Sequence, residues 1–120
     1  MIRVKVVGAG GYGGVGISEL VLRHPSAELV CLVDVENAGV PFSRLYPHLD
    51  GFLDRKITAP DAPDSQCEAD VAFMATPDGV GMQLAPAELD SGAKVIDYSG
   101  DFRFDTAESY ADYAARIGRD

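Results

Sequence analysis

Residues 6–16, VVGAGGYGGVG, hold six glycines in eleven positions, directly behind a run of apolar and β-branched residues. Glycine loses more conformational freedom on folding than any other residue, so this density is costly unless the backbone must turn tightly or be approached closely. The glycines fit two spacings: G-x-G-x-x-G from Gly8, Gly10 and Gly13, and G-x-x-G-x-x-G from Gly8, Gly11 and Gly14. Both spacings are typical of a turn that leads from a strand into a helix.

Strand-like and helix-like segments alternate along the rest of the chain. Buried strands are predicted at residues 2–8, 27–35, 69–76 and 94–99, and helices at residues 12–24, at 79–91 and from Thr106. Residues 36–55 are broken by glycine and proline, residues 55–58 are a candidate short edge strand, and residues 59–66 are a predicted loop. Fully apolar strands between helices predict an α/β fold of the Rossmann type, a doubly wound, mostly parallel sheet with helices on both faces.

Composition narrows the possible partners and the compartment. The chain has 120 residues, which suits one domain, and its net charge of −9 with no basic stripe argues against nucleic acid or an anionic membrane. No apolar stretch reaches membrane-spanning length, and the amino terminus shows no signal peptide. Two cysteines, Cys31 and Cys67, are too few for a disulfide framework, so we expect reduced thiols in a cytoplasmic protein. No His, Cys and carboxylate set has metal-ligand spacing, so we expect no metal.

The glycine loop predicts a dinucleotide site. Its first glycine makes the tight turn, the middle one lets a pyrophosphate approach the backbone, and the last lets the helix pack closely. The free N–H groups of the helix start carry a partial positive charge of about half a unit, which offsets the acidic background. The alternative is a glycine-rich turn with no ligand. The candidate residues of this loop are Gly8, Gly10, Gly11, Tyr12, Gly13 and Gly14.

Asp34 ends the second predicted strand, about 20 residues after the glycines. A carboxylate there can accept hydrogen bonds from the adenosine ribose and would repel a 2′-phosphate by about 4 kcal/mol per charge pair at 4 Å and an effective dielectric near 20. Asp34 therefore favours NAD over NADP. Two alternatives stay open: a solvated loop aspartate, or repulsion softened by Arg44, Arg55 or Lys56.

Four stretches in chain order resemble the N-acetyl-gamma-glutamyl-phosphate reductases, whose wider relatives are the aspartate-semialdehyde dehydrogenases. They are GAGGYGGVGISELVLRHP at 8–25, AGVPFSRLYPHLDG at 38–51, ATPDGVGMQLAP at 75–86 and VIDYSGDFRF at 95–104. The second and fourth are far more specific than a glycine loop, and the resemblance spans essentially the whole chain.

The resemblance implies a two-domain enzyme that takes hydride from a nicotinamide cofactor, NADP by family default, and reduces an acyl phosphate to the semialdehyde in arginine biosynthesis. It places the catalytic cysteine and histidine in a second domain beyond this chain, and neither Cys31 nor Cys67 matches that cysteine. Residues 1–120 are then a truncated amino-terminal, dinucleotide-binding part without catalytic residues of its own. We expect this part alone to be inactive, and the full-length protein to be a possible homo-oligomer.

The chain departs from the family pattern at several positions. Asp34 and Val35 replace a Ser-Arg pair, Asp78 replaces a histidine, Gly81 a serine, and Gly100 an alanine. These departures leave open which cofactor and which acyl phosphate are bound, whereas they do not affect the expected fold.

Two loops follow the third and fourth predicted strands and reach the same edge of the sheet as the glycine loop. Their candidate cofactor-binding residues are Thr76, Pro77, Gly79 and Ser99. Arg103 is a candidate for the substrate phosphate, because its planar guanidinium suits that group and related semialdehyde dehydrogenases use an arginine in a similar motif. The alternative for Arg103 is a salt bridge to Asp101 or Asp105, and Asp101 is a candidate for orienting Arg103 or for capping a turn.

His48 has two interpretations: it holds the long loop through hydrogen bonds to the backbone, or it lies at a substrate entrance. Two other functions also remain open. One is a stand-alone nucleotide-binding or sensing module without chemistry. The other is a domain of an aspartate-semialdehyde dehydrogenase relative, against which YPHLDG at 46–51 and SGDFR at 99–103 count.

Overall fold

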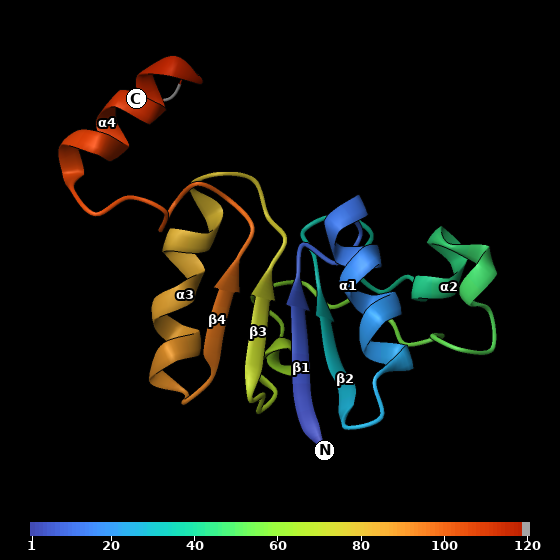
Figure 1. The fold of residues 1–120 in the computed structure, drawn as a ribbon. Coiled ribbons are helices and arrows are strands. Elements are labelled where there is room, and N and C mark those ends of the chain that lie inside the picture. Colours follow the sequence, from blue (N-terminus) through green and yellow to red (C-terminus); the bar gives the residue numbers. More distant parts are fainter. Residues whose placement is uncertain (119–120) are drawn as a thin grey trace.

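The computed structural model describes residues 1–118 and contains one four-stranded parallel sheet with the order β2-β1-β3-β4 (Figure 1). Its strands are β1 (Ile2–Val7), β2 (Ala27–Val33), β3 (Val71–Met74) and β4 (Lys94–Asp97). The predicted doubly wound parallel sheet is confirmed. The strands are shorter than predicted because the ladder stops where the chain turns into the loops of the carboxyl edge. Arg119 and Asp120, the last two positions of the predicted 1–120 domain, lie outside the described residues.

Three longer helices follow β1, β3 and β4. They are α1 (Tyr12–Arg23), α3 (Val80–Asp90) and α4 (Ala107–Arg116). Thr106 caps α4 through its side chain, which accepts a hydrogen bond from the Ser109 N–H at 3.1 Å, as its position at the predicted helix start suggests. Gly92, with a φ of +95°, turns the chain after α3. Among the described residues, no helix is long and apolar enough to cross a membrane.

Two hydrophobic clusters lie on opposite faces of the sheet. Side chains alternate along each strand, so Val4 and Val6 face one cluster and Val7 faces the other. The first cluster takes Val21 from α1, and Leu84 of α3 packs against the second. Each face is therefore covered by one of the two crossover helices, as a doubly wound sheet requires (Figure 1).

Residues 36–58 are more ordered than their broken sequence pattern indicates. They contain a one-turn helix α2 (Phe42–Leu45) and the 3₁₀ turn η1 (Pro47–Leu49), and Phe42 is fully buried in the first cluster. The candidate edge strand at 55–58 is reduced to isolated bridges, Pro41 with Lys56 and Val33 with Thr58. The segment is held by buried side chains and not by a regular ladder of strand hydrogen bonds. Its sequence therefore lacks the periodicity from which an ordered structure could have been predicted.

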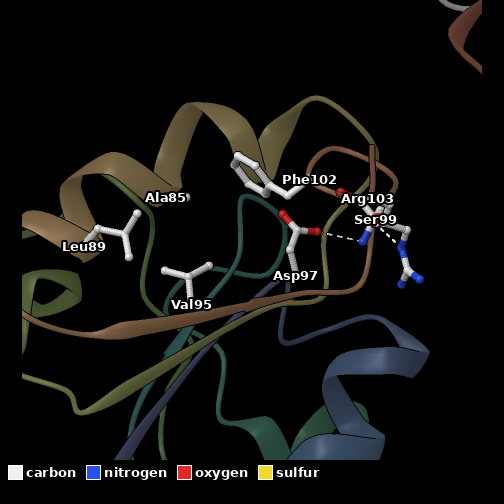
Figure 2. A pocket seen from close by; sticks show the side chains of 7 residues that line it. All are labelled: Ala85, Leu89, Val95, Asp97, Ser99, Phe102 and Arg103. Carbon is white, nitrogen blue, oxygen red and sulfur yellow. Dashed lines mark hydrogen bonds between the residues drawn. The ribbon is translucent and has the colours of Figure 1, made fainter. Parts of the chain in front are cut away.

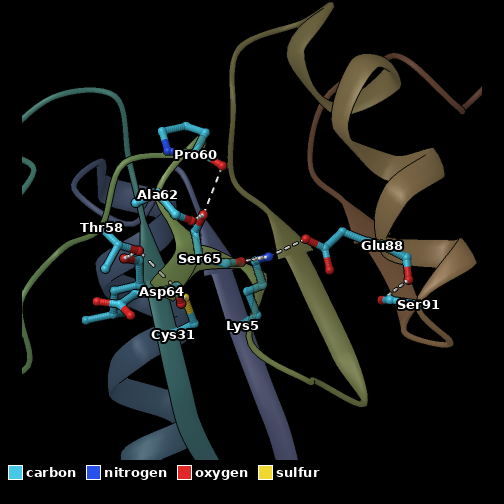
Figure 3. A network of polar contacts seen from close by, with 10 residues as sticks. Lys5, Cys31, Thr58, Pro60, Ala62, Asp64, Ser65, Glu88 and Ser91 are labelled. Carbon is cyan, nitrogen blue, oxygen red and sulfur yellow. Dashed lines mark hydrogen bonds and ion pairs between the residues drawn. The ribbon is translucent and has the colours of Figure 1, made fainter.

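A buried ion pair joins the sheet to α3 on the second face (Figure 3). Lys5 of β1 is only 4% exposed, and its ammonium donates hydrogen bonds to the Glu88 carboxylate and to the Ser65 carbonyl. Ser65 lies in the 3₁₀ turn η2 (Pro63–Gln66), where its hydroxyl donates to the carbonyls of Pro60 and Ala62. One cation thus links a strand, a helix and a turn that are far apart in sequence.

We predict that removing one partner of this pair costs more than removing both. Glu88→Leu leaves a buried ammonium without its counter-charge and should lower the free energy of unfolding by about 3 kcal/mol, measured by urea denaturation. Lys5→Met combined with Glu88→Leu should recover most of that loss, because no unpaired charge remains. Arg3→Gln, which removes an exposed pair with Glu68 and Asp70, is the matched control and should change the midpoint little. Additive losses in the double variant would contradict the prediction.

Candidate functional site

The topology places a crevice at the carboxyl ends of β1 and β3. The chain passes from β1 to β2 on one side and later returns to β3 on the other, so the strand order reverses between β1 and β3. Ligands of open α/β sheets bind at such a switch point. Gly8 lies there with a φ of +79°, and a Cβ on it would fall 2.2 Å from the Ala75 carbonyl oxygen after β3. Only glycine lets these two loops meet.

The glycine loop leaves the start of α1 open. A Cβ on Gly14 would fall 2.4 Å from the Ala9 carbonyl oxygen, so the helix is packed tightly onto the loop that precedes it. Gly11 is the N-cap residue, and an added Cβ there would meet only the Gly8 oxygen, at 3.6 Å. No side chain among residues 1–118 caps this helix, and Tyr12 beside it is 91% exposed. The N–H groups of Tyr12 and Gly13 therefore have no hydrogen-bond acceptor among residues 1–118, at an exposed helix start that can serve as an anion cradle.

Asp34 follows β2 and is bonded to the glycine loop. Its Oδ2 accepts the Gly10 N–H at 2.8 Å, and its Oδ1 accepts the Glu36 N–H at 3.3 Å. The Tyr46 hydroxyl donates to the Gly10 carbonyl at 2.7 Å, so both backbone groups of Gly10 are fixed. Burial raises the pKa of Tyr46, with nearby Tyr12 and Asp34 adding to the effect. Asp34 is thus no freely solvated loop aspartate, because it orders the loop beside which it lies.

Thr76 brings an unsatisfied hydroxyl to the same crevice. Its Oγ1 is buried without a hydrogen-bond partner in the described part of the chain, and its methyl group lies 3.2 Å from the position of a Cβ on Gly8. Buried hydroxyls nearly always find a partner, so an orphan next to an open cradle fits a site that a polar ligand completes. The open amides and this hydroxyl together fit a dinucleotide.

Two carboxylates tie the loops after β3 and β4 to each other. Asp101 accepts the Gly79 N–H at 2.8 Å and the Met82 N–H at 3.1 Å, and so caps the start of α3 from the neighbouring loop. In the opposite direction, Asp78 accepts the Gly100 N–H at 2.8 Å. Asp101 therefore has the capping role that was one of its expected roles.

Arg103 and Ser99 lie beside a cavity of about 350 Å³ at the outer edge of β4 (Figure 2). The Arg103 guanidinium donates to the carbonyls of Ser99, at 2.8 Å from Nε, and Tyr98, at 3.2 Å from Nη2. Within residues 1–118 it makes no ion pair with Asp101 or Asp105, the alternative its sequence context suggested. Figure 2 shows the guanidinium pointing away from the apolar lining. Nη1 has no hydrogen-bond partner in the described part of the chain and can therefore bind an anion.

The Ser99 side chain is occupied within its own loop. Ser99 is 7% exposed, and its hydroxyl accepts the Asp101 N–H at 3.2 Å. The Asp97 Oδ1 accepts the Ser99 N–H at 2.6 Å, while Oδ2 is buried without a partner among the described residues. That oxygen lies 2.0 Å from the position of a Cβ on Gly81, so any larger residue at 81 would displace the carboxylate. Ser99 thus shapes the loop through its hydrogen bonds.

Three tyrosines contribute to this edge of the sheet without having been selected from the sequence. Tyr46 holds Gly10 from 36 positions away, and Tyr98 packs its ring against Gly13, 3.2 Å from the position of a Cβ there. Burial raises the pKa of Tyr98. Tyr113 of α4 donates to Asp78 at 2.8 Å. Their partners are separated from them by long stretches of chain, so no local motif marks them.

His48 lies away from this edge and binds Glu19 of α1, with 2.5 Å between Nε2 and Oε1. The contact ties the long loop to α1, as the loop-holding interpretation expects, but the partner is a carboxylate and not the expected backbone group. The two cysteines also lie apart from the cradle: Cys31 is buried in β2, and burial and the Cys31 thiol raise the pKa of Cys67 to about 11. Cys67 therefore stays a protonated, poorly nucleophilic thiol at neutral pH. Residues 1–118 contain no cluster of His, Cys, Asp or Glu that could hold a metal ion.

Comparisons with known proteins agree with this geometry. The family model described as "Semialdehyde dehydrogenase, NAD binding domain" matches residues 3–115. The N-acetyl-gamma-glutamyl-phosphate reductase of Nitrosococcus oceani is 45% identical over 103 residues, which is 86% of this chain and 30% of that protein. The reductase of the same name from Methanosphaera stadtmanae is 45% identical over 109 residues, 91% of this chain and 31% of that protein. The chain therefore spans about three-tenths of the length of these curated relatives.

Solved structures show the same fold at low sequence identity. Aspartate semialdehyde dehydrogenase with NADP from Candida albicans superposes with a TM-score of 0.73 at 18% identity, over 99% of this chain and 40% of that one. Aspartate semialdehyde dehydrogenase II from Vibrio cholerae, complexed with ASA, gives 0.69 at 22% identity, over 88% of this chain and 33% of that one. Likenesses at this level of identity establish the fold alone.

The packing of α1 predicts opposite effects for two neighbouring glycines. Gly14→Ala places a methyl group against backbone carbonyls and should destabilise the protein by roughly 3 kcal/mol. Gly16→Ala, where no atom lies within 4 Å of the new methyl group, should stabilise it by about 0.5–1 kcal/mol through helix propensity. Chemical denaturation of both variants checks the prediction. Equal effects would show that the loop does not pack against Gly14 as described.

Proposed function

Because this chain belongs to the NAD-binding domain family of semialdehyde dehydrogenases, we propose that it is the dinucleotide-binding part of a longer oxidoreductase. The proposed reaction is the reduction of an acyl phosphate of the N-acetyl-glutamyl phosphate type to the semialdehyde, a step of arginine biosynthesis. The observation that carries the proposal is the uncapped start of α1, open to an anion at the switch point of the sheet. The bound cofactor supplies the hydride.

The proposal gives each part of the crevice a role. The amides of Tyr12 and Gly13 hold the diphosphate beside Gly11, whose own N–H donates to the Gly8 carbonyl at 3.2 Å, and Gly8 and Gly14 allow the loop to form. The orphan Thr76 hydroxyl and the backbone at Pro77, Gly79 and Ser99 line the nicotinamide half. Arg103, braced by two carbonyls, presents Nη1 to the substrate phosphate.

For the adenosine half, we propose that Asp34 favours NAD over NADP. Its carboxylate is fixed at the end of β2 by the Gly10 and Glu36 amides, where the ribose hydroxyls of a bound cofactor can donate to its remaining lone pairs. A 2′-phosphate would meet that charge at close range. The fungal relative whose structure holds NADP shows that the fold also accepts the phosphorylated cofactor, so this preference depends on the local residues.

The chemical step of the proposed reaction needs a nucleophilic thiolate, which attacks the acyl carbon and displaces phosphate to form a thioester. The hydride then adds to the thioester carbon, and loss of the thiolate leaves the aldehyde. Neither cysteine of this chain supplies that thiolate: Cys31 is buried, and Cys67 holds its proton. We therefore assign the chemistry to the part of the longer enzyme that this chain does not include. Both thiols are free, which supports the cytoplasm as the compartment of the whole protein.

Substitutions at Asp34 can distinguish the effect of its negative charge from the effect of its hydrogen bond to the Gly10 N–H. Asp34→Asn keeps an oxygen that can accept the Gly10 N–H and removes the charge, whereas Asp34→Ser loses both. Calorimetric titration should show the ratio of NADP to NAD affinity rising by roughly tenfold or more in both variants. Tyr46→Phe, which frees the Gly10 carbonyl and leaves the charge, should weaken both cofactors without changing the ratio. An unchanged ratio in Asp34→Asn removes Asp34 from the ribose site.

The division of roles predicts that this chain binds the reduced cofactor but does not oxidise it. With N-acetyl-glutamyl phosphate present, the absorbance of the reduced nicotinamide should stay constant. Fusion to the remaining part of a relative such as the Nitrosococcus oceani reductase should restore turnover. Robust oxidation by the 120-residue chain alone would contradict the assignment, and a fusion that binds cofactor without turnover would favour a non-catalytic binding module.

A further inference from the structure

Figure 1 shows helix α4 standing clear of the helices that cover the sheet. One of its side chains nevertheless reaches the candidate site. The Tyr113 hydroxyl donates a hydrogen bond to Asp78 Oδ2 at 2.8 Å. Its ring covers Gly100 so closely that a Cβ there would fall 2.6 Å from both the ring carbon Cε1 and the hydroxyl oxygen. Phe104 packs against the same ring, with 5.0 Å between centroids. Tyr113 is therefore seated in a fitted slot.

The slot connects α4 to both loops of the carboxyl edge. While Asp78 Oδ2 accepts the tyrosine hydroxyl, Oδ1 accepts the Gly100 N–H at 2.8 Å. Asp78 belongs to the Thr76–Gly79 turn after β3, and Gly100 to the loop after β4. Tyr113, Asp78 and Gly100 thus form a closed set of contacts in which each member touches the other two.

The cap made by Asp101 does not involve Tyr113, and this distinguishes the role of the Tyr113, Asp78 and Gly100 contacts from helix capping. Asp101 already fixes the Gly79 and Met82 amides at the start of α3, so the turn stays attached to its helix without Tyr113. The Tyr113 hydroxyl acts instead on the Asp78 side chain, between the turn and Gly100. Two of the departures from the family pattern noted in the sequence, Asp78 and Gly100, are the residues that receive Tyr113: one accepts its hydroxyl and the other leaves room for its ring.

We propose that Tyr113 is a positioning residue for the nicotinamide half of the cofactor site. It orients the Asp78 carboxylate, which holds the Thr76–Gly79 turn at a fixed distance from the loop at Gly100. The inference rests on the proposed function, because it requires that this turn line the nicotinamide. Tyr113 touches no reacting atom, and its effect reaches the cofactor through Asp78 and Gly100.

Comparing two ligands distinguishes positioning from a general loss of structure. NADH carries the nicotinamide, whereas ADP-ribose carries only the adenosine, diphosphate and second ribose. In fluorescence and calorimetric titrations of the 120-residue chain, Tyr113→Phe should weaken NADH roughly fivefold, because only part of the free energy of the lost hydrogen bond to the carboxylate is transmitted to the nicotinamide. ADP-ribose should bind as tightly to the variant as to the unmodified chain. Circular dichroism should show the same helix content in both.

A substitution at Gly100 tests the slot itself. Gly100→Ala should displace the Tyr113 ring and weaken NADH at least as much as Tyr113→Phe does. In a Tyr113→Ala background the added methyl group has no ring to displace, so the same substitution should cost little further affinity. This dependence on the background is the signature of direct contact.

The outcomes separate the two proposals. If the unmodified chain binds neither NADH nor ADP-ribose, the proposed cofactor site is wrong and the role of Tyr113 falls with it. If it binds both, and Tyr113→Phe weakens both equally or neither, the cofactor site stands and the positioning role is overturned. Equal costs of Gly100→Ala in the two backgrounds would likewise overturn it.

Discussion

The contact between Gly8 and the Ala75 carbonyl determines where everything else at this site can lie. It brings the loop after β1 against the loop after β3 at the point where the strand order reverses. Because no side chain intervenes, the chain can turn at once into α1, and the uncapped start of this helix lies beside the crevice. Gly14, in the first turn of α1, likewise allows close backbone packing, because it lets the helix contact the loop that precedes it. The anion cradle follows from backbone meeting backbone.

Carboxylates hold the crevice together in a protein of net charge −9. Asp34, Asp78 and Asp101 each accept at least one backbone N–H, from Gly10, Gly100 and Gly79 respectively. These bonds order the three loops, and the amide dipoles offset part of each negative charge. An acidic chain can thereby surround an anion site, because its nearest carboxylates are engaged with the backbone and the helix start stays uncapped.

On the second face of the sheet, the Lys5–Glu88 pair ties the carboxyl-terminal part of α3 to β1, and Asp101 caps the other end of that helix from the carboxyl edge. The two contacts act at opposite ends of α3. The Lys5–Glu88 pair attaches the helix to the core, and the Asp101 cap places its amino end beside the crevice. Stability and the geometry of the site thus depend on the same element.

The sequence by itself determined the parallel sheet, its covering helices and the glycine loop, because apolar runs, helix caps and glycine spacings are local patterns that act over a few residues. It also determined which loops share the carboxyl edge, since parallel strands place their ends together. Only the tertiary structure decided that Asp34 and Tyr46 bind Gly10, that Asp101 caps a helix 19 positions earlier at Met82, and that Tyr113 seats on Gly100. Those contacts join residues that the fold brings together from distant parts of the chain, and hydrogen bonds of this kind leave no periodic trace in the sequence.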